Sequence, residues 1–111
     1  MTDSEFALFH LHRALCDPVD PALVGSLSSD LQFRVNGEVY RFANDKNLER
    51  FTQAPELWCG VLRDPVSTRR FLPSSRSPQA YWVGGPYFFE NDSTKAAFVD
   101  EPQKYQVLRE L

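Results

Sequence analysis

The second half of this chain repeats the first. Asp17-Pro18-Val19 recurs as Asp64-Pro65-Val66, 47 residues later. More identities keep that spacing: Tyr40, Phe42, Asn44, Asp45, Phe51 and Pro55 are matched by Tyr87, Phe89, Asn91, Asp92, Phe98 and Pro102. Such self-similarity in order indicates an internal duplication. We predict one repeat over residues 16–58, a second over 63–105 that ends near Tyr105 as the first ends near Trp58, and a separate segment over 1–15.

Each repeat has the pattern of a β-hairpin followed by a helix. Residues 31–35 alternate apolar and polar side chains, Asn36-Gly37 strongly favours a tight turn, and residues 39–42 return. A helix is expected after Asn44 or Asp45, ending at a proline. In the second repeat we expect strands over 80–83 and 87–89, a helix after Asn91 or Asp92, and a last helical segment over 102–111. Residues 4–15 are expected to form a further helix and residues 67–79 a loop.

The turn of the second repeat is harder to place. Val35 and Gly37 recur as Val83 and Gly85, 48 residues later, which predicts one extra residue before the second turn. A three-residue turn over 84–86 would pair Val83 with Tyr87 and Trp82 with Phe88. A two-residue turn would instead set Trp82 beside Tyr87, and either turn leaves a large aromatic side chain facing away from the core.

Asp-Pro-Val, a hairpin with glycine in its turn, Tyr-x-Phe, a short helix with Phe, and Pro-x-x-aromatic follow one another in both repeats, an order that resembles the YHS domain. Metal-associated YHS domains carry cysteines at the positions of Asp20 and Ala43, and of Ser67 and Glu90, so the resemblance brings no metal site. A unit of this size needs a metal, disulfides or a partner to bury a sufficient core. We therefore expect an α+β fold in which two hairpin–helix units pack face to face with pseudo-two-fold symmetry.

YHS modules accompany heavy-metal transporters and bacterial multicomponent di-iron monooxygenases. The chain is also similar, in size and domain type, to small regulatory components of soluble methane monooxygenases that bind the hydroxylase and inhibit it. The resemblance implies a protein partner, the hydroxylase component of a di-iron monooxygenase. Two alternatives stay open: a copper- or metal-sensing protein, and an assembly factor for a multicomponent monooxygenase. A homodimer is a further possibility.

The charge balance argues against nucleic acid and anionic membranes as partners. Lys and Arg number 12 against 15 Asp and Glu, a formal net charge of −3, whereas those partners require a basic face. No apolar run approaches the roughly 20 residues of a membrane span. The acidic start over residues 1–5 lacks the basic region of a signal peptide. We therefore expect a cytoplasmic protein in which Cys16 and Cys59 stay reduced.

The sequence carries little sign of catalysis. Cys16 and Cys59 are possible nucleophiles with His10 and His12 as bases, but no catalytic motif surrounds them. The same four residues are the weak alternative for a metal site. On a helix, His10 and His12 would point about 200° apart and could not chelate together, whereas in a strand or at a frayed terminus they could. We predict a non-enzyme without a cofactor, and we interpret Asp17 and Asp64, each before a proline, as turn or cap residues.

Comparison of the repeats suggests a contact surface for a protein partner. The alternation in the first hairpin predicts that Arg34 and Arg41 point outward. With the shifted alignment, their counterparts are Trp82 and Phe88, and aromatic residues are enriched in binding hot spots. We predict a partner-binding surface that also takes in the adjacent loop; its residues are Trp82, Phe88, Arg69, Arg70 and Phe71.

Overall fold

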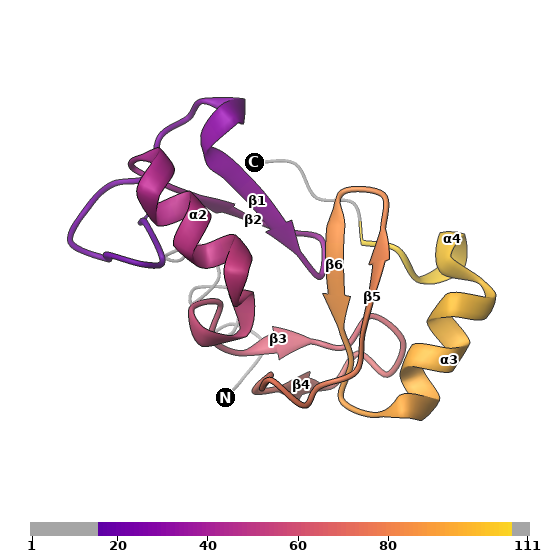
Figure 1. Cartoon of the computed structure of the whole chain (residues 1–111). Helices are drawn as coiled ribbons and strands as arrows, with labels where there is room; N and C mark the ends of the chain where they lie inside the picture. Colours follow the sequence, from indigo (N-terminus) through magenta and orange to yellow (C-terminus); the bar gives the residue numbers. More distant parts are fainter. Residues whose placement is uncertain (1–15, 108–111) are drawn as a thin grey trace.

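The computed structural model describes residues 16–107, which form a small α+β fold of antiparallel strand pairs and helices (Figure 1). Hairpin 1 pairs β1 (Gln32–Val35) with β2 (Glu38–Arg41) and precedes α2 (Asp45–Gln53). Hairpin 2 pairs β5 (Gln79–Trp82) with β6 (Gly85–Phe88) and precedes α3 (Asp92–Asp100). The remaining elements are η1 (Ser29–Leu31), η2 (Pro55–Leu57), β3 (Leu62–Arg63), β4 (Arg70–Phe71) and α4 (Pro102–Tyr105).

Some expected elements lie outside the described residues, and one differs from the structure. The expected helix over 4–15 lies outside the described residues, as does the end of the segment expected to be helical up to Leu111. The expected loop over 67–79 contains β4, which pairs with β3. Within residues 16–107, no helix is long and apolar enough to cross a membrane.

Both longer helices begin where the sequence predicts. Asn44 and Asn91 are the N-caps, and their side chains accept hydrogen bonds from Asn47 N and Thr94 N, each at 2.9 Å. Such caps satisfy backbone N–H groups that have no partner inside the helix. Each helix ends shortly before a proline that opens the next helical turn. A hairpin thus precedes a helix in both halves of the described chain.

The one-residue shift expected in the second hairpin is wrong. β1, β2 and α2 each recur 47 residues later as β5, β6 and α3. The turn of hairpin 2 is Val83-Gly84, and the register pairs Trp82 with Gly85 and Ala80 with Tyr87. Neither expected pairing of Trp82 occurs. Gly84, at φ 100°, supplies the positive dihedral that a two-residue turn requires, as Gly37 does in hairpin 1 at φ 78°.

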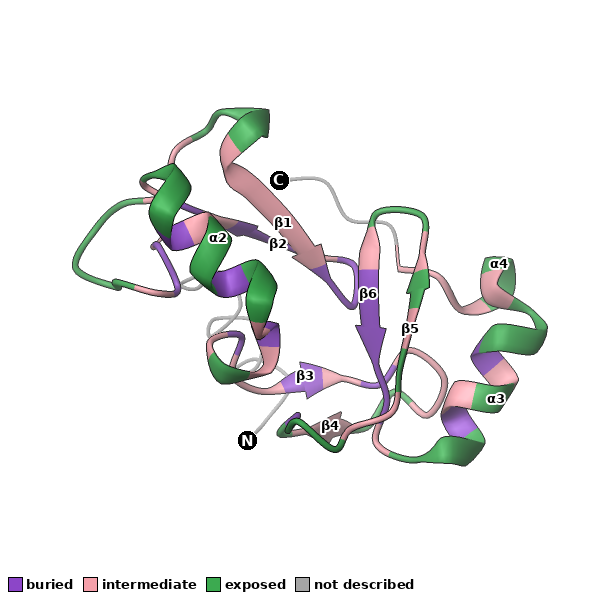
Figure 2. Ribbon diagram, viewed as in Figure 1, coloured by how far each residue is buried: buried purple, intermediate pink, exposed green. Residues whose placement is uncertain are grey.

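The core consists of two apolar clusters on opposite sides of β6. One holds Phe88 together with residues of the first repeat and the segment after it: Val35, Tyr40, Phe42, Phe51, Cys59 and Leu62. The other holds Tyr87, Phe89 and Phe98, with Trp82 packed against it. Because successive residues of a strand face opposite sides, β6 serves both clusters. Figure 2 shows the result, since β6 is mostly buried while β5 alternates between intermediate and exposed.

The turn of hairpin 1 joins the two halves at β6 (Figure 1). Asn36 N donates to Pro86 O at 3.1 Å, and its side-chain amide both donates to Phe88 O at 3.0 Å and accepts from Phe88 N at 2.7 Å. A side-chain amide offers the same donor and acceptor as a peptide group. Asn36 therefore pairs with Phe88 as a neighbouring strand residue would. Val83, at the equivalent turn position, is 77% exposed, so the turns of the two hairpins are packed differently.

Candidate interaction surface

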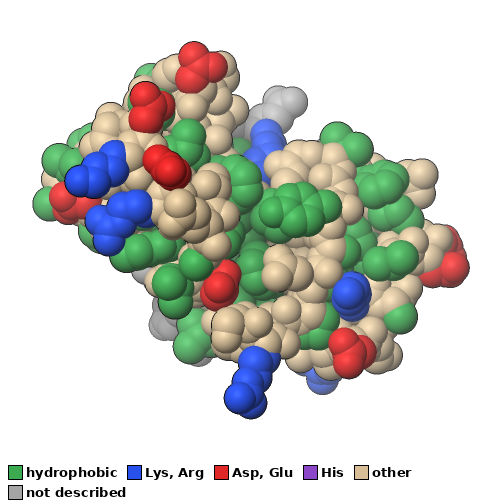
Figure 3. All heavy atoms as spheres, in the orientation of Figure 1, with side chains coloured by type: hydrophobic (Ala, Val, Ile, Leu, Met, Phe, Trp, Pro, Cys, Tyr) green, Lys and Arg blue, Asp and Glu red, His purple; other side chains and the backbone are tan. Residues whose placement is uncertain are grey.

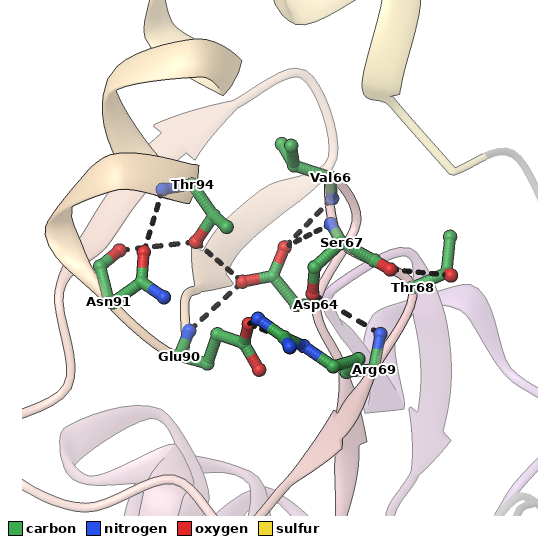
Figure 4. Close-up of polar contacts among 8 residues, drawn as sticks. All are labelled: Asp64, Val66, Ser67, Thr68, Arg69, Glu90, Asn91 and Thr94. Atoms are coloured by element: carbon green, nitrogen blue, oxygen red, sulfur yellow. Dashed lines mark hydrogen bonds and ion pairs between the residues drawn. The ribbon is translucent and has the colours of Figure 1, made fainter.

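A buried carboxylate ties the start of the second repeat to α3. Asp64 is fully buried, and its Oδ1 accepts from Val66 N at 2.8 Å and Ser67 N at 3.1 Å. Its Oδ2 accepts from Glu90 N at 3.0 Å and Thr94 Oγ1 at 2.6 Å. Figure 4 shows these bonds converging from the turn, the end of hairpin 2 and the first turn of α3. Four donors on one carboxylate satisfy a charge that would be costly to bury alone.

Asp17 has the same surroundings in the first repeat. It is fully buried, and its Oδ1 accepts from Val19 N at 2.8 Å and Asp20 N at 3.2 Å. Its Oδ2 accepts from Ala43 N and Asn47 Nδ2, both at 2.9 Å. The two aspartates therefore shape the predicted turns and also hold each turn to the helix of its own repeat.

Two further residues of the second repeat lie beside the Asp64 carboxylate. They are Ser67 and Glu90, whose backbone N–H groups donate to Asp64. Their side chains contact Arg69: Ser67 Oγ accepts from Arg69 N at 3.2 Å, and Glu90 Oε1 lies 2.6 Å from Arg69 Nη2. The Arg69–Glu90 ion pair and the Ser67 hydroxyl therefore lie beside the Asp64 carboxylate, and the side chain of Arg69 is 72% exposed.

The weak metal alternative gains no support from the described part of the chain. Cys59 is fully buried in the first cluster, and its Sγ donates to Gly60 O at 3.6 Å. Cys16 is half-buried and forms an isolated bridge with Val24. His10 and His12 lie outside the described residues. Within residues 16–107 no group of three His, Cys, Asp or Glu residues could hold a metal ion.

The prediction that Trp82 and Phe88 point outward together is wrong. Phe88 is 1% exposed in the first cluster, whereas Trp82 is half-buried against the second and donates its Nε1–H to Gln106 at 3.2 Å. They lie on opposite faces of hairpin 2 because the constant offset reverses the parity that the shifted alignment assigned to β5. Of the predicted loop residues, Phe71 packs half-buried against the first cluster and Arg70 is half-buried, so Arg69 is the exposed one.

The constant offset instead selects Tyr81 and Val83. Tyr81 stands where hairpin 1 has Arg34, and Val83 stands where it has Asn36. Their exposed fractions are 73% and 77%. In Figure 3, apolar side chains gather near the centre of the view, over hairpin 2, and charged side chains lie mostly toward the rim. Equal spacing on both sides of the turn was the sequence signal that could have identified this pair.

Comparison with known proteins found no match. No family model, no curated protein and no solved structure is similar to this chain at a significant level. The candidate surface therefore rests on the geometry of hairpin 2, where Tyr81 and Val83 are exposed.

Proposed function

We propose that this chain is a non-catalytic regulatory protein of the cytoplasm. In this proposal it binds the hydroxylase of a di-iron soluble methane monooxygenase and inhibits it by competing with the enzyme's regulatory component. The support is the resemblance of both repeats to YHS domains, and the likeness in size and domain type to the D component of that enzyme system. The two hairpin–helix units are then fused YHS-like copies, related by an approximate two-fold axis away from their turns.

The observation that carries the binding proposal is the exposed pair Tyr81 and Val83. Hairpin 1 has Arg34 and Asn36 at the equivalent positions, so the hairpin–helix unit forms without apolar side chains there. Exposed apolar side chains that lie together mark interaction surfaces more often than single ones do, and tyrosine is enriched at interface hot spots. To inhibit the hydroxylase, this chain needs only to occupy the docking site of the regulatory component, because no chemical step is required of the inhibitor.

A double substitution that copies hairpin 1 tests this surface. Tyr81→Arg with Val83→Asn places at hairpin 2 the side chains that hairpin 1 tolerates, so the fold should persist. We expect affinity for the purified hydroxylase to fall at least tenfold, or about 1.4 kcal/mol. A binding titration and a melting curve on the same variant measure both properties. Leu27→Arg is the control, because Leu27 is 85% exposed in a segment outside both hairpins.

The outcomes separate the surface from the function. If the parent chain binds the hydroxylase and the folded double variant binds equally well, Tyr81 and Val83 are not the contact surface. If the parent chain neither binds the hydroxylase nor slows its turnover in the presence of the regulatory component, the proposed function is wrong. If it binds without slowing turnover, an assembly role replaces inhibition.

A further inference from the structure

The turn of hairpin 1, which contacts β6 of hairpin 2, contains a chemically reactive pair of residues, Asn36 and Gly37. Asn36 is the only asparagine of the sequence that is followed by glycine. Without a side chain on the next residue, the following backbone nitrogen can reach the asparagine amide carbon, which makes Asn-Gly prone to deamidation. The pair occupies the turn through its positive φ angles, 51° at Asn36 and 78° at Gly37. The residues that suit the turn are therefore also the reactive ones.

In the folded chain the Asn36 amide is held away from this reaction. Asn36 is 3% exposed, and its Nδ2 donates to Arg63 O and to Phe88 O, each at 3.0 Å. Its Oδ1 accepts from Phe88 N at 2.7 Å. Attack by Gly37 N requires the amide to rotate out of these bonds, and it requires water to reach the product. Both requirements are met only when hairpin 1 separates from β6.

We propose that Asn36 is a deamidation site whose reactivity is controlled by the docking of hairpin 1 on β6. In the open chain, Gly37 N forms a bond to Asn36 Cγ, the Cγ–Nδ2 bond breaks, and the nitrogen leaves as ammonia with the proton from Gly37 N. Water then opens the five-membered imide at one of its two carbonyls. The product is aspartate or isoaspartate, and no oxidant, reductant or enzyme is needed.

The product cannot restore the contact. A carboxylate at this position has no hydrogen to donate, and it would face Arg63 O and Phe88 O across the distances that the amide now bridges. Isoaspartate also inserts an extra backbone atom into a two-residue turn. Each opening that ends in deamidation therefore removes the chain irreversibly from the docked state, which makes Asn36 a one-way switch.

Ageing of the full-length chain tests the control by docking. Folded protein and protein in denaturant are incubated at the same pH and temperature, and the tryptic peptide of residues 35–41 is followed by mass spectrometry. We expect conversion of Asn36 at least about tenfold slower in the folded chain, because only the open fraction reacts. Equal rates in the two samples would overturn the proposal. Asn44 and Asn91, which are exposed and precede aspartates, serve as internal references within each sample.

Two variants test the consequence. Asn36→Gly removes the amide and keeps a residue suited to positive φ, whereas Asn36→Asp mimics the product. We expect the melting temperature to fall in the order parent, Asn36→Gly, Asn36→Asp, because only the last places an anion against two carbonyl oxygens. An Asn36→Asp chain that melts with the parent would overturn the one-way switch. If Asn36→Asp does not fold, the aged parent protein is denatured and refolded instead. Recovery of its deamidated fraction in the folded state would overturn the one-way switch.

Discussion

At the scale of single residues, the strongest constraint is the pair of buried carboxylates. Asp17 and Asp64 each accept four hydrogen bonds, two from the following turn and two from the end of the hairpin and the helix. The donors are backbone N–H groups except for Asn47 and Thr94, which supply a side-chain amide and a hydroxyl at the same place in their helices. Both repeats therefore have an aspartate as the acceptor, whereas the donor from the helix differs between them.

Replacing Asp64 with Asn should destabilise the chain even though the side chain keeps its shape. The new NH₂ group would face donors, so at least one of Val66 N, Ser67 N, Glu90 N and Thr94 Oγ1 loses its acceptor. We expect a loss of about 2–4 kcal/mol in the free energy of unfolding, since bonds to charged groups contribute about 1.5–3 kcal/mol each. Urea denaturation measures this loss. Asp100→Asn, exposed at the end of α3, is the control and should stay within about 0.5 kcal/mol; equal stability of Asp64→Asn and the parent would contradict the role of the carboxylate.

At the scale of elements, local signals predicted the parts of the fold whose causes are local. The Asn-Gly turn, the asparagine caps and the prolines after the helices each act within a few residues, and the structure has them where expected. The failure lay in Val83 and Gly85, whose identity with Val35 and Gly37 suggested an insertion that does not exist. Strand parity depends on the register of the pair, so one misplaced residue moved Trp82 to the predicted outward face. Phe88, at the position of Arg41, is buried for a different reason, because the first cluster covers that face of hairpin 2. The packing of β6 between two clusters had no local signal at all.

The two glycines of hairpin 2 should respond differently to alanine. At Gly84, a Cβ would meet only Arg34 Cδ at 3.5 Å, so the cost is that of a positive φ, about 1–2 kcal/mol. At Gly85, also at positive φ, a Cβ would lie 2.5 Å from Arg34 O, a backbone atom. We therefore expect Gly85→Ala to reduce the free energy of unfolding more than Gly84→Ala does, as measured by urea denaturation of both variants. The opposite order would mean that hairpin 2 does not approach β1 so closely in solution.

At the scale of the whole molecule, the two repeats contact each other at β6. Hairpin 2 contributes Phe88 to the first cluster, and hairpin 1 contributes Asn36 to the edge of β6. The first cluster is therefore incomplete without Phe88 of the second repeat, whereas the second cluster consists of residues between Val66 and Val107. Small units bury too little apolar surface to be stable alone, and these contacts join the two units into one structure. The contacts also imply that the two repeats unfold together.

The two tryptophans can test that cooperativity, because they report on different clusters. Trp58 packs against the first cluster and Trp82 against the second, and the chain has no others. We expect the Trp58→Phe and Trp82→Phe variants, each with one remaining fluorophore, to unfold in urea with the midpoint that circular dichroism gives for the same variant. Phe88→Ala, introduced into either background, should lower both midpoints, with a loss of about 3–5 kcal/mol typical of a buried phenylalanine. If Phe88→Ala lowered only the transition reported by Trp58, the repeats would be independent units, and the interlock through β6 would not hold them together.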